Sequence, residues 1–260
     1  MSGYLASIWQ CRYFWLSLVK MDLRTRYRRS ILGLGWSLLH PIAMTTVLCT
    51  VFHKLFNMDV ANYGPFLLTG LTLWNFLTST VTQGCDCFYA GENYIRQHPA
   101  PIAIYPLRTA LGAAFHFGVA LGVVLLLTWS FRGFANIPVL FSLAPAIVLL
   151  LVLGWSLAAL SGFAAVIFPD MKHLFEIGLQ IVFYATPILY PSDAMQDKGL
   201  SWLMKYNPVV PWLDLFRQPL LNGELPTLNN YLVTIGTATL CAAIAGLTLM
   251  RLQRRLILYL

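Results

Sequence analysis

The run from Val139 to Phe168 reads VLFSLAPAIVLLLVLGWSLAALSGFAAVIF and contains no charged residue. A helix needs about 20 mostly apolar residues to cross a bilayer, so this run is long enough for one crossing with some tilt. The whole chain agrees, because 58% of its 260 residues are hydrophobic, 10% are charged, and the mean hydropathy is +0.68. The composition predicts an all-α integral membrane protein and excludes a cytosolic enzyme, a disordered regulator and a secreted disulfide scaffold.

Five further apolar runs are separated by polar or proline-rich links, which predicts six transmembrane helices in all. The expected spans are residues 31–56, 66–90, 107–131, 139–168, 174–189 and 231–250. They form a transmembrane domain over residues 31–260, preceded by an N-terminal segment of residues 1–30. With the N terminus inside, twelve of the 17 Lys and Arg residues fall on the cytoplasmic side and five outside. This excess favours cytoplasmic positions for both termini.

The N-terminal segment has the pattern of an amphipathic helix at a membrane surface. Its apolar residues recur at three- and four-residue spacing, and basic residues lie between them. The apolar positions are Leu5, Ile8, Trp9, Leu16, Val19 and Leu23, and the basic positions are Arg12, Lys20, Arg24 and Arg26. A flanking helix that only anchors and orients the chain is the alternative.

The link between the second and third spans, residues 87–106, is unusually apolar for a cytoplasmic loop. Besides Glu92, Arg96 and His98 it contains Phe88, Tyr89, Tyr94, Ile95, Ile102 and Tyr105. Exposed apolar groups gathered in this way mark protein contacts. We therefore expect a short helix offered to a soluble partner and ended by Pro99 and Pro101. The alternative is a loop that folds back on the protein's own helices.

The outer segment from Tyr190 to Asn230 is too interrupted for two full spans and too apolar for a free loop. It contains five prolines together with Trp202, Tyr206, Trp212 and Phe216. Backbone that is not helical at membrane depth must be shielded by protein or water. Two short re-entrant or interfacial helices on either side of Asn207-Pro208 satisfy both facts.

Small residues recur at four-residue spacing in two of the spans. They are Ala114, Gly118 and Gly122 in the third span, and Gly154, Ala158 and Gly162 in the fourth. This spacing lets helices approach closely. We expect these faces to pack against other helices, either within one subunit or across a dimer interface.

Residues that could carry chemistry are scarce. His40 and His116 are ionisable groups inside the spans, where charge is costly, and we expect neutral histidines bonded to a neighbouring helix rather than a proton relay. The five cysteines lack metal-ligand spacing, and the Gly-x-x-x-x-Gly-Lys-Ser/Thr loop that holds nucleotide phosphates is absent. We expect no catalytic residue, metal or cofactor in this chain. If ATP is used, another chain hydrolyses it.

Aromatic residues are common inside the spans as well as at their ends. Those inside are Trp36, Phe52, Phe76, Phe115, Phe117, Phe183 and Tyr184. Aromatic faces suit the apolar faces of sugar rings, and Tyr and Trp can also donate hydrogen bonds to sugar hydroxyls. Ordinary packing against lipid and other helices is the alternative for each of them.

Four motifs connect the sequence to a known family. They are RYRRSILGLGWSLLHP at residues 26–41, LWNF at 73–76, NYIRQH at 93–98 and PLR at 106–108. In order and position they closely resemble the membrane subunit of type-2 ABC exporters for O-antigen, capsular polysaccharide and teichoic acid, over essentially the whole chain. The first motif is the most specific. The pair Cys85 and Cys87 departs from the family pattern and leaves the start of the helix in the link undefined.

The resemblance implies an assembly and assigns roles to parts of this chain. Two copies pair with two ATPase subunits, which bind ATP and Mg²⁺, and the N-terminal helix lies along the cytoplasmic interface. The link supplies a coupling helix that sits on the ATPase, with Glu92, Asn93, Tyr94, Ile95, Arg96, Gln97 and His98. Gate helices between spans five and six carry Trp202, Tyr206, Trp212 and Phe216. The location implied is a bacterial cytoplasmic membrane.

The mechanism that follows from the resemblance is mechanical. ATP-driven closure of the partner subunits opens a path between the two copies for a lipid-linked glycan with a diphosphate at its lipid end. Cationic residues that could attract this diphosphate are Arg24, Arg26, Arg28 and Arg29, although topology and bulk lipid binding explain them as well. Candidate aromatics of the path are Trp36, Phe52, Phe183 and Tyr184. The rival functions are export of drugs or small lipids, and a membrane enzyme that acts on lipid-linked sugars.

Overall fold

The computed structural model of the chain describes residues 2–28, 30, 33, 35–54, 59–97, 100–133, 137–191, 201–253 and 256. These residues form helices and their connections, and none of those described lies in a β-strand, which confirms the all-α fold class. The helices are α1 (Ser2–Gln10), α2 (Arg12–Tyr27), α3 (Gly35–Phe52), α4 (Val60–Cys85), η1 (Tyr89–Gly91), α5 (Glu92–Gln97), α6 (Ile104–Arg132), α7 (Ile137–Leu140), α8 (Leu143–Ile167), α9 (Met171–Ala185), α11 (Ser201–Tyr206), α12 (Val209–Arg217), η2 (Gln218–Asn222) and α13 (Leu228–Leu252).

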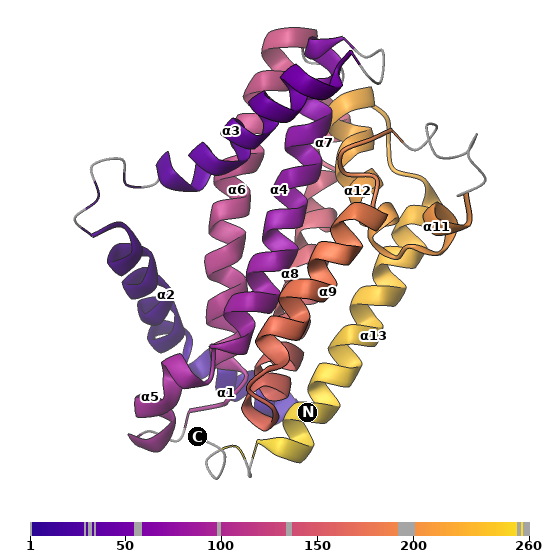
Figure 1. Cartoon of the computed structure of the whole chain (residues 1–260). Helices are drawn as coiled ribbons and strands as arrows, with labels where there is room; N and C mark the ends of the chain where they lie inside the picture. The colour runs from indigo at the N-terminus through magenta and orange to yellow at the C-terminus, as the bar shows by residue number, and fades with distance from the viewer. Residues whose placement is uncertain are drawn as a thin grey trace.

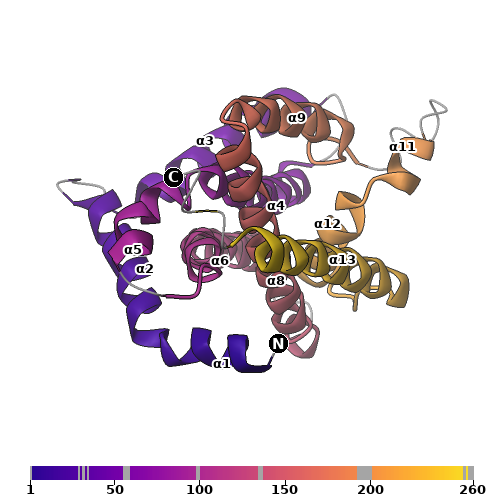
Figure 2. The same ribbon diagram turned by 90° about the horizontal axis from the view of Figure 1, so that it is seen from below.

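Four long helices, α4, α6, α8 and α13, lie side by side at the centre of the molecule (Figure 1). Helix α9 packs against α4 and α8, while α3 crosses α4 and α6 obliquely (Figure 1). We call the end of the bundle that carries α1, α5 and the end of α13 the base. Seen from the base, α1 and α2 form an angle around α6 (Figure 2). The N-terminal segment is thus two helices that meet at Cys11, where we expected one.

Helices α4 and α8 pack so closely that side chains larger than hydrogen do not fit at their contact. A Cβ on Gly154 would lie 2.6 Å from the Phe76 ring, and one on Gly162 would lie 2.8 Å from the Cys87 sulfur. Gly84 on α4 is equally tight, because a Cβ there would lie 2.7 Å from the Ala158 backbone. The small residues predicted to pack in the fourth span therefore do so, against α4 within one chain.

The small-residue face of α6 behaves differently. A Cβ added at Gly118 or Gly122 would meet no atom within 4 Å among the residues that the structure describes. Ala114, the third member of the expected face, is half-buried beside the main core. These two glycines therefore do not pack closely within one chain, and their packing across a dimer interface stays a prediction.

Three helical segments are long and apolar enough to cross a membrane, judged by length and composition over the described residues. They are Ile104–Phe131, Ile137–Ile167 and Leu228–Leu252. The other three expected spans correspond to α3, α4 and α9, which are shorter or less apolar. The count of six spans stays a prediction, and so does the division into residues 1–30 and 31–260.

The segment after α9 leads back into the bundle. Two short helices, α11 and α12, lie on either side of Asn207-Pro208, as the sequence indicated. The Asn207 side chain donates hydrogen bonds to the Ala185 carbonyl and the Thr186 hydroxyl, and it accepts one from the Val209 amide. Helix α12 continues through the π-helical turn η2 to Gly223, whose φ of 67° favours glycine. These contacts attach α12 to the end of α9.

Candidate coupling helix and membrane pocket

Helix α5 is the short helix expected in the cytoplasmic link, and it lies beside α2 at the base (Figure 2). The rings of Tyr94 and Phe14 meet edge to face with centroids 5.8 Å apart. Arg96 donates a 2.9 Å hydrogen bond to Glu92 one turn earlier, which supports this short helix. Helix α5 therefore contacts α2 directly, so a movement of α5 would press on α2.

The apolar residues of the link do not gather on its outer surface. Phe88 and Tyr105 are fully buried in an apolar cluster at the base, and Tyr94, Ile95 and Ile102 pack against that cluster. The prediction that these apolar residues are exposed for a protein partner is therefore wrong, because the link folds back on helices of its own chain. The part of α5 left exposed consists of Asn93, Arg96 and Gln97, with Tyr89 in the preceding turn. His98 lies outside the described residues.

Helix α2 is joined to α6 by two polar contacts, each between residues about 90 positions apart in the sequence. Arg108 makes a bidentate ion pair with Asp22, in which its Nε and Nη2 atoms both donate to the carboxylate. Farther along the same two helices, the Tyr27 hydroxyl and His116 Nδ1 are hydrogen-bonded at 3.0 Å. The expectation that His116 bonds to a neighbouring helix is confirmed, and that helix is α2.

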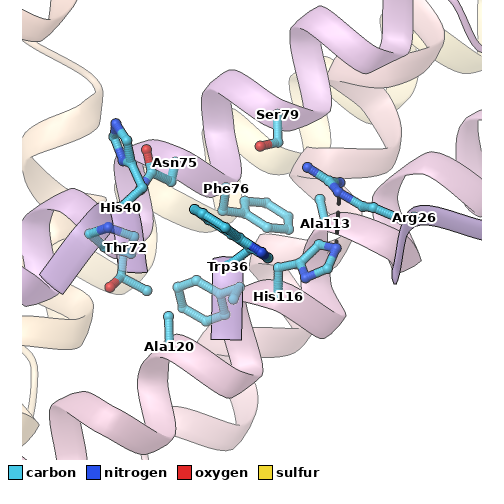
Figure 3. A pocket seen from close by; sticks show the side chains of 12 residues that line it. Arg26, Trp36, His40, Thr72, Asn75, Phe76, Ser79, Ala113, His116 and Ala120 are labelled. Carbon is cyan, nitrogen blue, oxygen red and sulfur yellow. Dashed lines mark hydrogen bonds between the residues drawn. The ribbon is translucent and has the colours of Figure 1, made fainter. Parts of the chain in front are cut away.

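A cavity of about 200 Å³ lies between α2, α3, α4 and α6. Its polar residues are Arg26, His40, Thr72, Asn75, Ser79 and His116, and its apolar wall includes Trp36, Phe76 and Phe117. In the view of Figure 3, Trp36 lies between the Arg26 and His116 pair on one side and His40, Asn75 and Thr72 on the other. Arg26 Nη1 is 3.5 Å from His116 Nε2. We call this cavity the membrane pocket.

The structure brings only part of the predicted diphosphate set to this pocket. Arg26 lines it, whereas Arg24 and Arg28 are exposed and are not among its lining residues. Arg29 lies outside the described residues. Sequence reasoning missed Thr72, Asn75 and Ser79, which recur on one face of α4 at three- and four-residue spacing. That spacing of polar residues within an apolar helix was the available signal.

The four candidate path aromatics do not form one site. Trp36 lines the membrane pocket, while Phe52 packs beside a small cluster of Cys49, Tyr63 and Leu67. On α9, the Phe183 ring lies 5.6 Å from that of Trp74 and is half-buried, and Tyr184 is exposed. Only Trp36 and Tyr184 are therefore left open to a ligand within one chain.

The aromatics assigned to the outer gate divide into two groups. Trp212 and Phe216 on α12 belong to the main core, with 2% and 1% of their surfaces exposed. The Phe216 ring meets that of Phe117 with centroids 5.3 Å apart, and the Trp212 indole donates to Thr237 on α13. Trp202 and Tyr206 on α11 are exposed. Helix α12 is thus part of the bundle, and only α11 presents aromatic side chains outward.

Arg217 at the end of α12 is a buried residue that sequence reasoning did not single out. Its Nη1 donates to the Pro187 carbonyl at 2.7 Å, and its Nη2 donates to the carbonyls of Ile188 and Phe66. The guanidinium also lies 3.7 Å from the centre of the Phe66 ring, a cation–π contact. Arg217 therefore joins α12, the segment after α9 and α4. A lone Arg in an apolar outer segment was the available signal.

The pair Cys85 and Cys87 has a structural explanation. Both thiols are buried, because α4 ends at Cys85 and the chain turns against α8. Asp86 between them faces outward and accepts a 2.6 Å hydrogen bond from Lys172 at the start of α9. This hydrogen bond raises the pKa of the Lys172 ammonium group. Helix α5, the candidate coupling helix, begins only at Glu92.

The fold is that of a multi-pass membrane protein. It combines a bundle of long apolar helices with amphipathic N-terminal helices and a short helix at the base. The sequence pattern of one family, described as the ABC-2 type transporter, matches residues 13–221. The chain belongs to the ABC-2 type transporter family. The resemblance inferred from the four sequence motifs is confirmed at this level.

Curated relatives cover most of the chain at low identity. The O-antigen export system permease protein RfbA of Klebsiella pneumoniae is 26% identical over 211 residues, which are 80% of this chain and 81% of that protein. RfbA of Myxococcus xanthus is 27% identical over 225 residues, 84% of each chain. The polysialic acid transport protein KpsM of Escherichia coli is 24% identical over 234 residues, 88% of this chain and 90% of that protein.

Proposed function

We propose that this chain is the transmembrane subunit of an ATP-driven exporter that moves a lipid-linked polysaccharide across a bacterial cytoplasmic membrane. The polysaccharide is of the O-antigen, capsule or teichoic acid type. The observation that carries the proposal is membership of the ABC-2 transporter family together with relatives whose names state O-antigen export and polysialic acid transport.

The proposed assembly contains two copies of this chain and two ATPase subunits. ATP and Mg²⁺ bind to the partner subunits, and this chain is a transport subunit rather than an enzyme. Six spans are proposed from the apolar runs, and the distribution of Lys and Arg favours both termini in the cytoplasm. Tyr4 on α1 and Leu249 on α13 line one apolar cavity, as an even number of spans requires. The first and last helices therefore end on the same side of the bundle.

In this proposal, α5 receives the movement of the ATPase and α2 passes it on. The exposed residues Asn93, Arg96 and Gln97 face the partner. Contact between Tyr94 and Phe14 transmits a push from α5 to α2. The ion pair of Asp22 with Arg108 then carries it to α6. Because α3 follows α2 along the chain, the same push also moves the helix that forms one wall of the proposed path.

The glycan path is proposed to lie between the two copies, along α3 and α9. Both helices carry exposed apolar side chains that one chain leaves uncovered, including Val47 and Val51 on α3 and Ile177 and Ile181 on α9. The cationic residues Arg24, Arg26, Arg28 and Arg29 attract the lipid diphosphate from the cytoplasmic leaflet. Helices α11 and α12 form the outer gate, with Trp202 and Tyr206 turned outward.

Site-specific photocrosslinking tests the coupling step. A photoreactive residue replaces Asn93 or Gln97 in cells that express the chain with its ATPase. We expect an adduct to the ATPase whose yield changes with ATP. The matched control is the same photoreactive residue at Phe141, which is exposed at the opposite end of the bundle and should give no such adduct. Absence of an adduct from both positions of α5 in a folded, membrane-inserted protein would overturn the coupling assignment.

Substrate stimulation of the purified complex tests the transported class. ATP hydrolysis by the complex in nanodiscs is measured with a lipid-linked glycan, with a small lipid, and with a panel of drugs. Stimulation by the glycan alone supports polysaccharide export. Stimulation only by small lipids or drugs favours the rival exporter, and release of a modified sugar without ATP favours the membrane enzyme.

A further inference from the structure

We propose that the membrane pocket is a binding site for a sugar phosphate at the lipid end of the transported glycan. In this site the phosphate lies against Arg26 and His116, and the adjoining sugar ring lies over Trp36 with its hydroxyls toward Asn75 and Thr72. This inference rests on the proposed function, because it names the part of the substrate that the chain recognises.

The charge of the pocket selects an anion. The Arg26 guanidinium supplies cationic donors for phosphate oxygens at one end of the pocket, where its Nη1 lies 3.5 Å from His116 Nε2. None of the described residues that line the pocket is an Asp or Glu. The nearest carboxylate on α2, that of Asp22, is already paired with Arg108. The positive end is therefore available to a ligand rather than neutralised within the chain.

At the other end of the pocket, the buried Thr72 hydroxyl lacks a partner among the described residues, and a ligand that displaces its covering atoms would supply one. Thr72 is 3% exposed, and its Oγ1 has no hydrogen-bond partner among the described residues. Leaving a buried hydroxyl unpaired costs about 1–3 kcal/mol. The other threonines of α4 with buried hydroxyls, such as Thr69 and Thr80, bond to a carbonyl of their own helix. Thr72 lines the pocket and, unlike these two threonines, its hydroxyl makes no such bond.

The aromatic wall and the size of the pocket limit what fits. Trp36 is exposed and stands between the two polar ends in Figure 3, in the position of a stacking platform for one ring. The volume of about 200 Å³ is below the range of roughly 300–1,000 Å³ that is typical of drug-sized ligands. A phosphate with one adjoining sugar therefore suits the pocket, whereas an oligosaccharide does not.

The same chemistry, a phosphate beside several hydroxyls, occurs in two sources. One is the lipid-linked glycan, and the other is the headgroup of an ordinary anionic phospholipid such as phosphatidylglycerol. The proposal assigns the pocket to the glycan, because a flexible headgroup gains little from the flat face of Trp36. Competition between the two ligands tells the sources apart.

The test is a binding measurement on the complete complex in phosphatidylcholine nanodiscs. The probe is a radiolabelled short-chain polyprenyl diphosphate that carries one hexose. We expect Arg26→Gln to weaken binding about tenfold and Thr72→Val about fivefold, the effects of one charged and one neutral hydrogen bond. Lys20→Gln removes an exposed charge from the same helix outside the pocket, and Thr80→Val removes a satisfied buried hydroxyl. Both controls should bind as the unmodified complex does.

Three outcomes overturn the proposal. Equal weakening by Arg26→Gln and Lys20→Gln, with none by Thr72→Val, means a general electrostatic attraction at the surface. Full competition by phosphatidylglycerol means that the pocket takes bulk lipid. In the third outcome, the complex fails to bind the probe while it still forms the ATP-dependent adduct from α5. That result refutes the pocket as a binding site and leaves the coupling role of α5 intact. Loss of the adduct itself counts against the proposed function instead.

Discussion

Helices α8 and α9 are neighbours in sequence and in space, yet they are held by different means. Helix α8 contacts α4 along its length through glycines that admit no side chain, and thirteen of its 25 residues are buried. All 15 residues of α9 are described, and none of them is buried. Helix α9 packs on the core through half-buried side chains such as Leu179 and Phe183. Polar contacts also hold it near its ends, Lys172 with Asp86 at the base and Arg217 with the carbonyls of Pro187 and Ile188 beyond the other end.

The difference separates a rigid part of the molecule from a part that is able to move. Close packing along a whole helix leaves no second arrangement of similar energy, so α4 and α8 move as one body. A helix with no buried residue, such as α9, loses fewer packing contacts when it tilts than α8 would. Three substitutions probe this contrast, from the strongest expected effect to the weakest.

Gly84→Val should destabilise the protein most. The new Cβ would lie 2.7 Å from the backbone of Ala158 and 2.3 Å from the Ser161 hydroxyl, so α4 and α8 must separate. We expect a loss of about 3 kcal/mol, measured as a lower thermal unfolding midpoint in detergent. Gly118→Val is the matched control, because α6 has open space there. Equal losses in the two variants would show that helix propensity, rather than close packing, sets the stability.

Arg217→Met should act locally at the outer end of α9. Three carbonyl acceptors lose their donor, and amide exchange over residues 188–190 should accelerate about tenfold, as expected for roughly 1.4 kcal/mol. Global stability should change less, because burying the guanidinium charge is itself costly. Hydrogen exchange followed by mass spectrometry measures the effect. Lys205→Met, at an exposed cation on α11, is the control, and the idea fails if its exchange rises as much.

Lys172→Ala should have the smallest effect on stability. The ion pair with Asp86 is open to solvent, and such pairs contribute about 0–1 kcal/mol. We expect an almost unchanged unfolding midpoint but a wider range of α9 positions, read as a broader spin-label distance distribution between positions 174 and 89. A double variant with Asp86→Ala should add nothing further. An added loss from the second substitution would mean that the two residues act separately.

The sequence predicts the helices of this fold well because their signals are local. Apolar runs, together with Pro169, Asn207 and Pro208, place the ends of α8, α11 and α12 within a few residues. The break at Cys11 is not signalled, since the apolar spacing continues across it. The inward packing of Phe88 and Tyr105 was also missed, because composition does not tell whether an apolar link faces a partner or its own bundle.

The membrane pocket depends on contacts that no local pattern contains. Tyr27 and His116 are 89 residues apart, and they meet only because α2 lies along α6. Arg26 was identified by its charge and Trp36 by its ring, but each was placed in a different set. The polar face of α4 joins them once α3 crosses it obliquely. Residue types could thus be predicted from sequence, while their assembly into one cavity required the structure.

Gly33, with a φ of +50°, lies between α2 and α3, and a Cβ there would meet no atom of the described residues within 4 Å. This left-handed conformation suits glycine, and the chain changes direction at this residue. Arg26 and Trp36 stand on opposite sides of it and belong to the same pocket, so a bound sugar phosphate would bridge the two helices. Linkage is reciprocal. If nucleotide binding to the partner alters the angle between α2 and α3, it must alter the affinity for the glycan, and the glycan must alter the affinity for nucleotide by the same factor.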